Sequence, residues 1–335
     1  MKFAAQAACA IGWLWLAGCT ASGPRQEAFG ETGPGQVELE ATPFFPQSEY
    51  QCGPAALATV LAAGAVDVTP DELVPEVYLP ARRGSLQVEL VAATRARGRL
   101  PYVLAPRDDV LFDELAAGRP VLVLQKLGAG PWPGWHYAVL VGYDRERQSV
   151  LLRSGTTRRL EMSVRRFLWS WQRGGRWAML ALEPGELPAG AEMDRYVDAA
   201  AGLEAVGRLD EATRAYRSAS LRWPDAALPW LGLANVAYAR EDLPAAQSLY
   251  EEALAREPAD VAARNNHAEV LLQLGCRSAA ALEIAVAKEH ARGGALEAAV
   301  TETAARIAEA TAPDAAACPT PARDANVVDG GVRPE

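Results

Sequence analysis

The pattern of apolar and polar positions divides the chain into three parts. Ala4–Leu16 is an apolar run, interrupted only by Gln6, that is too short for a comfortable membrane span. From about residue 41 to residue 185, short apolar runs of strand length follow patterns typical of amphipathic helices. Beyond residue 190 the chain is rich in alanine, and its pattern is helical throughout. The pattern therefore predicts an α+β domain followed by an all-α domain.

Within the α+β part, the expected helices come first and most of the expected strands follow. Helical patterns cover residues 55–63, 86–97 and 110–117, and another helix is expected to begin at Pro70 with Thr69 as its N-cap. Apolar runs rich in β-formers cover residues 100–104, 120–125, 136–143, 148–153 and 176–182. This order predicts a sheet with helices packed on it.

The first helical pattern begins beside a cysteine. Pro54 has no N–H group and suits the first turn of a helix, while Gly64 ends the apolar run. Cys52 is therefore expected at the helix N-terminus, where unpaired N–H groups and the helix dipole favour an anion. We expect a lowered thiol pKa there, and the thiolate is the nucleophile. The alternative is a buried structural cysteine.

A candidate base stands at the start of an expected buried strand. His136 is the only histidine before His267, and the run that it opens ends at Tyr143. A cysteine and a distant histidine are the sequence form of a nucleophile and its general base. The alternative is a core histidine bonded to a carbonyl, but the Cys-Gly-Pro stretch favours catalysis.

These two stretches resemble the bacteriocin-processing (double-glycine leader) peptidases of the papain-like clan. The resemblance covers roughly residues 40–185 and is specific at Cys52-Gly-Pro-Ala-Ala-Leu and His136-Tyr-Ala-Val-Leu-Val-Gly-Tyr-Asp. It implies a papain-like cysteine peptidase domain that needs no cofactor. It also implies that Cys52 attacks a peptide carbonyl, His136 is the base and Gln47 donates to the oxyanion. Gln51 is the alternative donor.

The residue that should orient the histidine departs from the family pattern. An Asp or Asn is usual after the next strand, and Ser154 occupies that place. A serine can hold an imidazole by a hydrogen bond, but it has no charge to stabilise imidazolium. Three interpretations stay open. The enzyme works as a Cys–His dyad, Asp144 or Glu161 takes the role, or activity is lost and the cleft only binds peptide.

The N-terminal run ends in a lipid-attachment motif. Leu16-Ala-Gly-Cys19 resembles the bacterial lipoprotein box. The resemblance implies that residues 1–18 are a signal peptide and that Cys19 carries the lipid anchor; an uncleaved anchor is the alternative. Thr20 is not the aspartate that usually retains such proteins at the inner membrane. We therefore expect the periplasmic face of the outer membrane, with residues 19–40 as a flexible tether.

The remaining cysteines fit an exported protein. Of the five cysteines, Cys9 would leave with the signal peptide, and Cys276 and Cys318 have no other role. They could form a disulfide in an oxidising compartment, or stay as two free thiols. No cluster of potential ligands has metal-site spacing.

A 34-residue period runs through the alanine-rich part, residues 191–310. Residues recurring at this interval include Ala212, Ala246 and Ala280, and Tyr216, Tyr250 and Ile284. The pattern resembles the tetratricopeptide repeat, which implies paired helices and a protein partner; a coincidental bundle is the alternative. Residues 183–190 are expected to be the linker before it, and residues 311–335 a disordered tail.

Composition narrows the function. The net charge is −9 with no basic block, which argues against nucleic acid as a partner. We expect a membrane-anchored cysteine peptidase with a peptide or protein substrate in its cleft. The alternatives are an inactive peptide-binding scaffold, and an amidase or transferase that uses the same Cys–His chemistry.

Overall fold

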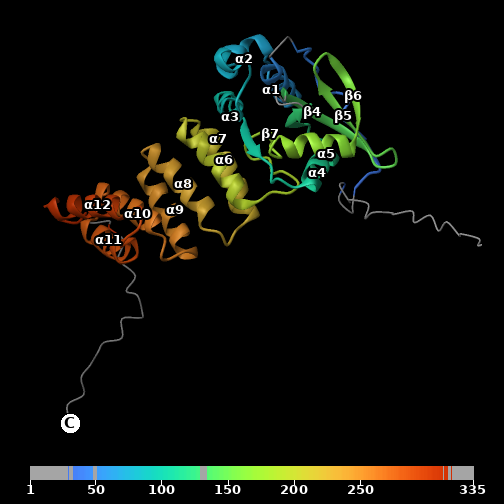
Figure 1. The fold of residues 1–335 in the computed structure, drawn as a ribbon. Helices are drawn as coiled ribbons and strands as arrows, with labels where there is room; N and C mark the ends of the chain where they lie inside the picture. The colour runs from blue at the N-terminus through green and yellow to red at the C-terminus, as the bar shows by residue number, and fades with distance from the viewer. Residues whose placement is uncertain are drawn as a thin grey trace, which may run out of the picture.

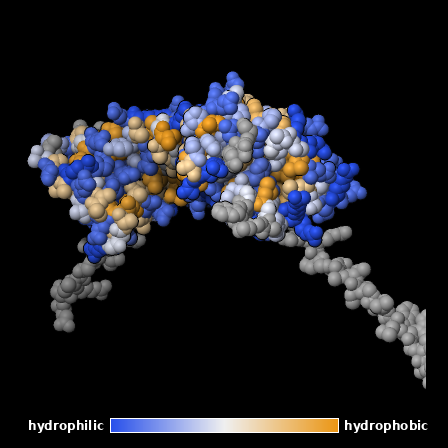
Figure 2. Space-filling view, turned by 45° about the horizontal axis from the view of Figure 1, so that its top comes forward, coloured by the Kyte–Doolittle hydropathy of each residue, from blue (hydrophilic) through white to orange (hydrophobic). Residues whose placement is uncertain are grey.

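The structure is a computed structural model that describes residues 29, 33–47, 51–128, 134–311, 313–315 and 318. Cys19 and the whole predicted signal peptide lie outside these residues. None of the helices in the described ranges is both long and apolar enough to cross a bilayer. Figure 2 shows polar residues over most of one face of the molecule, with apolar residues gathered only in small areas.

The first domain is built on an antiparallel sheet. Its main path runs in the order β2–β7–β3–β4–β5–β6, and β1 pairs with the far end of β4 (Figure 1). The strands are β1 (Gln36–Glu38), β2 (Leu100–Val103), β3 (Val121–Leu127), β4 (Gly134–Asp144), β5 (Ser149–Ser154), β6 (Thr157–Ser163) and β7 (Ala178–Leu182). β3, β4, β5 and β6 follow one another in the chain and pair in that order, whereas β7 comes after α5 and lies between β2 and β3 in the sheet.

Helices cover both faces of this sheet. Their bounds are α1 (Cys52–Ala63), α2 (Pro70–Val77), the 3₁₀ turn η1 (Pro80–Arg82), α3 (Gln87–Ala96), α4 (Asp108–Ala116) and α5 (Val164–Arg173). Alternate residues of β3 face opposite cores: Leu122 packs with α1, α2 and α3, and Val123 packs with α4 and α5. Because both faces are covered, the central strands are continuous apolar runs.

The predicted α+β layout of the first domain is confirmed, and most elements lie within a few residues of their expected bounds. α1 begins at Cys52 and ends at Ala63, as Pro54 and Gly64 predicted. β6 and α5 were missed. β6 carries mostly exposed polar residues, so it has no apolar run. α5 is amphipathic, and a helix is predicted by the spacing of its buried apolar residues, which are Val164, Phe167, Leu168 and Trp171.

The expectation of a tether over residues 19–40 is wrong for its described C-terminal part. Val37 pairs with Tyr143 in the sheet. Phe29 is buried, with its ring centroid 4.5 Å from that of Phe112 and 5.3 Å from that of Tyr143. The local Gly and Pro content favours a flexible chain. Strand pairing with β4 and aromatic contacts with residues far along the chain nevertheless order these residues.

The second part of the chain is all-helical, and each helix packs on the next (Figure 1). The helices are α6 (Met193–Ala205), α7 (Leu209–Arg222), α8 (Leu228–Ala239), α9 (Leu243–Arg256), α10 (Val261–Gln273), α11 (Arg277–Ala291) and α12 (Glu297–Glu309). α7, α9 and α11 begin at residues 209, 243 and 277, so their starts are 34 residues apart. Gly232 of α8 lets Tyr216 pack closely, because a Cβ there would lie 2.4 Å from its ring. The assignment to tetratricopeptide repeats stays a prediction.

The segment at residues 183–190 is held tightly between the two parts. The fully buried Glu114 accepts a hydrogen bond from Ala189 N at 2.8 Å and pairs with Arg119 at 2.5 Å. Arg119 also reaches Glu186 at 3.3 Å. Tyr196 of α6 joins the core on the α4 face of the sheet, so the two parts share buried side chains.

The C-terminal end of the helical part is fastened by a covalent bond. Cys276 and Cys318 form a disulfide with an S–S distance of 2.16 Å. Ala315 N donates to Gly275 O at 3.0 Å, and Ser278 N donates to Asp314 at 3.0 Å. The predicted disordered tail is therefore wrong for residues 313–315 and 318. The rest of it, apart from residue 311, lies outside the described residues.

Candidate active site

Cys52 is the first residue of α1, as the sequence predicted. In the first turn Ala55 N donates to Gln51 O at 3.3 Å and Pro54 has no N–H, so the N–H groups of Cys52 and Gly53 are left beside the sulfur. Gly53 is required here because a Cβ on it would lie 2.2 Å from Ser85 Oγ. The buried Ser85 hydroxyl has no hydrogen-bond partner among the described residues, and no sequence pattern predicted its place beside the first turn of α1.

Both Cys52 and Gln47 lie beside the backbone of Tyr137, the residue after His136. Tyr137 pairs with Leu124 of β3, and Leu124 N donates across its other edge to Trp177 O at 3.1 Å. The pair is therefore of the non-hydrogen-bonded kind, and the polar groups of Tyr137 point away from β3. On that side β5 has already separated, because its first paired position on β4 is Val139.

Cys52 and Gln47 occupy the place that β5 leaves open. The Tyr137 N–H lies close enough to the Cys52 sulfur to affect its pKa. Gln47 Nε2 donates to Tyr137 O at 3.3 Å, and Gln47 N donates to Gly155 O at 3.0 Å. The helix N-terminus and the glutamine amide thus replace a neighbouring strand at the edge of β4. This places Cys52 and Gln47 on the two polar groups of a single residue.

His136 is held by Ser154, which stands where the resemblance implies an Asp or Asn. His136 Nε2 lies 2.8 Å from Ser154 Oγ. Ser154 is buried at the end of β5, and His136 is half-buried at the start of β4. This hydrogen bond occupies one nitrogen of the imidazole and leaves Nδ1 for another group.

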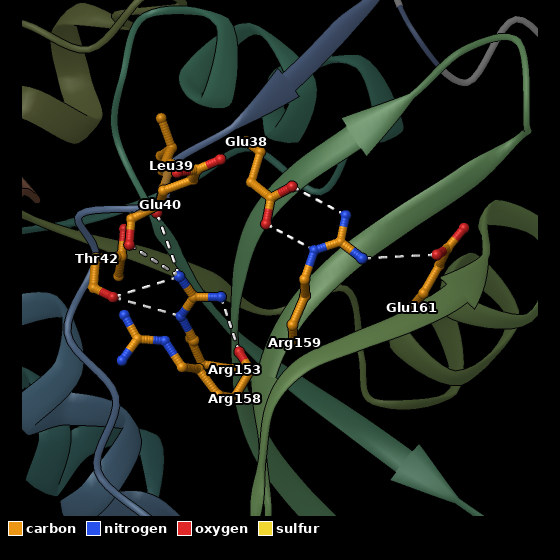
Figure 3. A network of polar contacts seen from close by, with 8 residues as sticks. All are labelled: Glu38, Leu39, Glu40, Thr42, Arg153, Arg158, Arg159 and Glu161. Carbon is orange, nitrogen blue, oxygen red and sulfur yellow. Dashed lines mark hydrogen bonds and ion pairs between the residues drawn. The ribbon is translucent and has the colours of Figure 1, made fainter.

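The alternative hypothesis that Asp144 or Glu161 orients His136 is wrong. Asp144 ends β4, eight residues beyond His136, which at a rise of about 3.3 Å per residue puts it roughly 26 Å away. Its carboxylate accepts from Arg147 N at 2.9 Å. Glu161 has 42% of its side chain exposed and pairs with Arg159 at 3.8 Å, as Figure 3 shows.

The expected low pKa of the nucleophile is also wrong. Burial raises the pKa of the Cys52 thiol above its ordinary value, and the N–H groups of Tyr137, Gly53 and Cys52 offset only part of that rise. Burial lowers the pKa of His136. Both groups are therefore neutral near pH 7. For the thiol, the free energy lost by removing water from the thiolate exceeds the stabilisation that these N–H groups give it.

Cys52 and Gln47 are linked to the residue after His136 through the β4 backbone. In the described part of the chain, no hydrogen bond joins Cys52 Sγ to His136. Trp135 is 56% exposed beside the histidine, with Lys126 Nζ 5.3 Å from its ring centroid. Residues 48–50 and 129–133 are outside the described residues. The described residues contain no group of three His, Cys, Asp or Glu side chains that could hold a metal ion.

Part of the chain matches a known protein family, and the match lies in the first domain. Residues 39–178 match the model of the Peptidase_C39 like family. Among solved structures, a putative C39-like peptidase from Bacillus anthracis is 19% identical, with a TM-score of 0.36, over 43% of this chain and 96% of its own. The peptidase domain of Streptococcus ComA, a bifunctional ABC transporter of a quorum-sensing pathway, is 21% identical over 42% of this chain and 96% of its own, with a TM-score of 0.35.

A different solved structure aligns with part of the chain at a similar level. The type III secretion translocator chaperone SycD of Yersinia enterocolitica is 18% identical over 35% of this chain and 83% of its own, with a TM-score of 0.33. Scores this low carry no weight for function. No curated protein matches the chain. The family match stands apart from these likenesses: residues 39–178 form a C39-like peptidase domain, and an all-helical region follows it.

Proposed function

We propose that the C39-like domain is a cysteine peptidase in which Cys52 attacks the carbonyl of a peptide bond. One observation carries this proposal: Cys52 and Gln47 meet at the backbone of Tyr137, directly after a histidine whose Nε2 is 2.8 Å from Ser154. Nucleophile, base and oxyanion donor thereby converge from three separate segments. A core cysteine would need none of these polar neighbours.

The pKa directions determine the proton's path. Since both groups rest in the neutral state, the thiol proton moves to His136 Nδ1 while the sulfur–carbon bond forms. Nε2–H donates to Ser154 Oγ and keeps Nδ1 unprotonated until then. The imidazolium gives the proton to the leaving amine. Water, deprotonated by the same nitrogen, then hydrolyses the thioester and restores the thiol.

The negative oxygen of the tetrahedral intermediate needs donors that are already in place. The Cys52 N–H at the start of α1 is one of them. The second N–H of the Gln47 amide is the other, because its first is directed to Tyr137 O. Anchoring by Tyr137 O and Gly155 O holds the amide without a large entropy loss during the reaction.

Acylation by p-nitrophenyl acetate tests this function without knowledge of the natural substrate. We expect one p-nitrophenol released per protein in a burst, at a rate that rises with pH through the pKa of His136. That pKa is lowered, so the rise should be complete by neutral pH. Alkylation by iodoacetamide, which needs thiolate alone, should keep rising towards the raised pKa of Cys52.

The burst experiment distinguishes the peptidase from the scaffold and from the transferase. Absence of a burst at every pH would contradict the enzyme proposal, and retained peptide binding would then favour the scaffold. A burst followed by faster release to added amines than to water would favour a transferase.

We also propose that the protein is anchored to the cell envelope through a lipid on Cys19. The support is the Leu16-Ala-Gly-Cys19 motif at the end of an apolar run. Cys19→Ser should move the protein from the membrane fraction to the soluble fraction and abolish incorporation of labelled fatty acid. Cys9→Ser is the matched control, since Cys9 would leave with the signal peptide. Membrane association that survives Cys19→Ser would point to an uncleaved anchor.

A further inference from the structure

Arg153, the residue before Ser154, is a buried cation bound by backbone carbonyls. Its relative exposure is 4%, and its guanidinium donates to four carbonyl oxygens (Figure 3). Nη1 donates to Arg158 O at 2.7 Å, and the other nitrogens donate to the carbonyls of Leu39, Glu40 and Thr42 at 3.4 Å each. No carboxylate hydrogen-bonds this guanidinium among the described residues, so it forms no ion pair there.

Burying the charge of Arg153 without a carboxylate partner costs free energy. Burial lowers the pKa of Arg153, which shows the penalty for removing its charge from water. An apolar side chain would fill the same space without that penalty. What only a guanidinium can do is bind several carbonyls of one segment at once, because its donors form a rigid fork. Arg153 thus fixes the path of residues 39–42.

The segment that Arg153 fixes leads directly to Gln47. Thr42 is followed by Pro43 and Pro46, whose φ angles are locked, so the chain between Thr42 and Gln47 is stiff. At its far end, Gln47 N donates to Gly155 O at 3.0 Å. Arg153 and Gly155 flank Ser154 on the same hairpin. The turn from β5 to β6 therefore holds the histidine's partner and both ends of the Gln47 segment.

We propose that Arg153 is a positioning residue that holds the Gln47 amide at the oxyanion. The proposal rests on the proposed function, since it assigns a task to the same acyl-transfer site. Neighbouring residues of a strand point to opposite faces, so Ser154 serves His136 while Arg153 serves the segment of Gln47. One strand end would thus align the base and the oxyanion donor.

The test compares two reactions of the same thiol. Acylation by p-nitrophenyl acetate forms an oxyanion, whereas alkylation by iodoacetamide does not. Arg153→Met keeps the apolar stem and removes the donors, and it should slow acylation by about 10- to 100-fold. Alkylation should hardly change. Arg158→Met is the matched control because it removes an exposed arginine of the same hairpin but keeps the carbonyl that Arg153 binds. It should leave both rates unchanged.

A double-mutant cycle tests whether the effect passes through Gln47. Gln47→Ala should slow acylation by ~10²-fold. Adding Arg153→Met to it should cause no further loss, because the amide to be positioned is gone. Arg153→Lys, which keeps the charge but not the fork, should lose acylation selectively to an intermediate extent. It gives the same readout if the methionine variant folds poorly.

The outcomes that overturn the inference differ from those that overturn the function. Equal loss of acylation and alkylation in Arg153→Met, or full additivity with Gln47→Ala, would show a merely structural arginine. Absence of acylation by the unaltered protein would instead refute the peptidase proposal, and this inference would fall with it.

Discussion

Replacing Cys52 by alanine is expected to abolish acylation, with a loss on the order of 10⁶-fold. The reason is that the reaction passes through a covalent bond to this sulfur. Cys52 is the only free cysteine in the described part of the chain, since Cys276 and Cys318 are joined to each other. The measurement is the p-nitrophenol burst, together with the mass of the intact protein after exposure to p-nitrophenyl acetate.

The control for this variant changes cysteines away from the site. Replacing both Cys276 and Cys318 by serine opens the disulfide beside α11 but leaves the sheet untouched, so the burst should persist. An acetyl group that appears at full stoichiometry on Cys52→Ala would place the nucleophile elsewhere and contradict the proposed site.

Replacing His136 by alanine is expected to slow acylation by ~10²–10⁴-fold, the usual contribution of a general base. The pH profile should change as well. Without the imidazole, acylation can proceed only through thiolate, so its rate should keep rising with pH towards the raised pKa of Cys52. Alkylation by iodoacetamide should change little. Burial, not the histidine, is the main cause of the raised thiol pKa.

Two further variants separate the roles of base and orienter. Ser154→Ala leaves the base but removes its hydrogen bond at 2.8 Å, so its loss should be smaller than that of His136→Ala. His290→Ala removes an exposed histidine of the helical part and should have no effect. Unchanged acylation in His136→Ala, with an unchanged pH profile, would show that another group takes the proton.

Local chain rules were sufficient for many elements. Pro54 and Gly64 bound α1, because a residue without an N–H group suits a first turn and glycine ends an apolar helical run. The apolar runs predicted the central strands, since burial on both faces requires apolar side chains at every position. The 34-residue interval predicted the equal spacing of α7, α9 and α11. All of these depend on residues close in sequence or on a fixed period.

The candidate pair could also be found in the sequence, because Cys52 and His136 each stand at an element boundary. Their electrostatics could not. The helix N-terminus argues for a low thiol pKa, but the burial of the thiol comes from the core cluster against which Cys52 packs, and that cluster joins helices and strands far apart in the chain. When desolvation and a few N–H groups compete, the sign of the shift depends on distances that no local pattern contains.

Tertiary structure likewise decided which polar residues serve the site. In the sequence Ser154 stood at the place that the resemblance implies, with Asp144 and Glu161 as alternatives, and the register of β4 with β5 and β6 brings Ser154 beside His136. Arg153 reads in the sequence as an ordinary arginine within a strand. It becomes a buried clamp on residues 39–42 only because the sheet brings together segments more than a hundred residues apart. Sequence thus determined the elements and the reactive residue types, whereas long-range pairing and burial determined their partners and charge states.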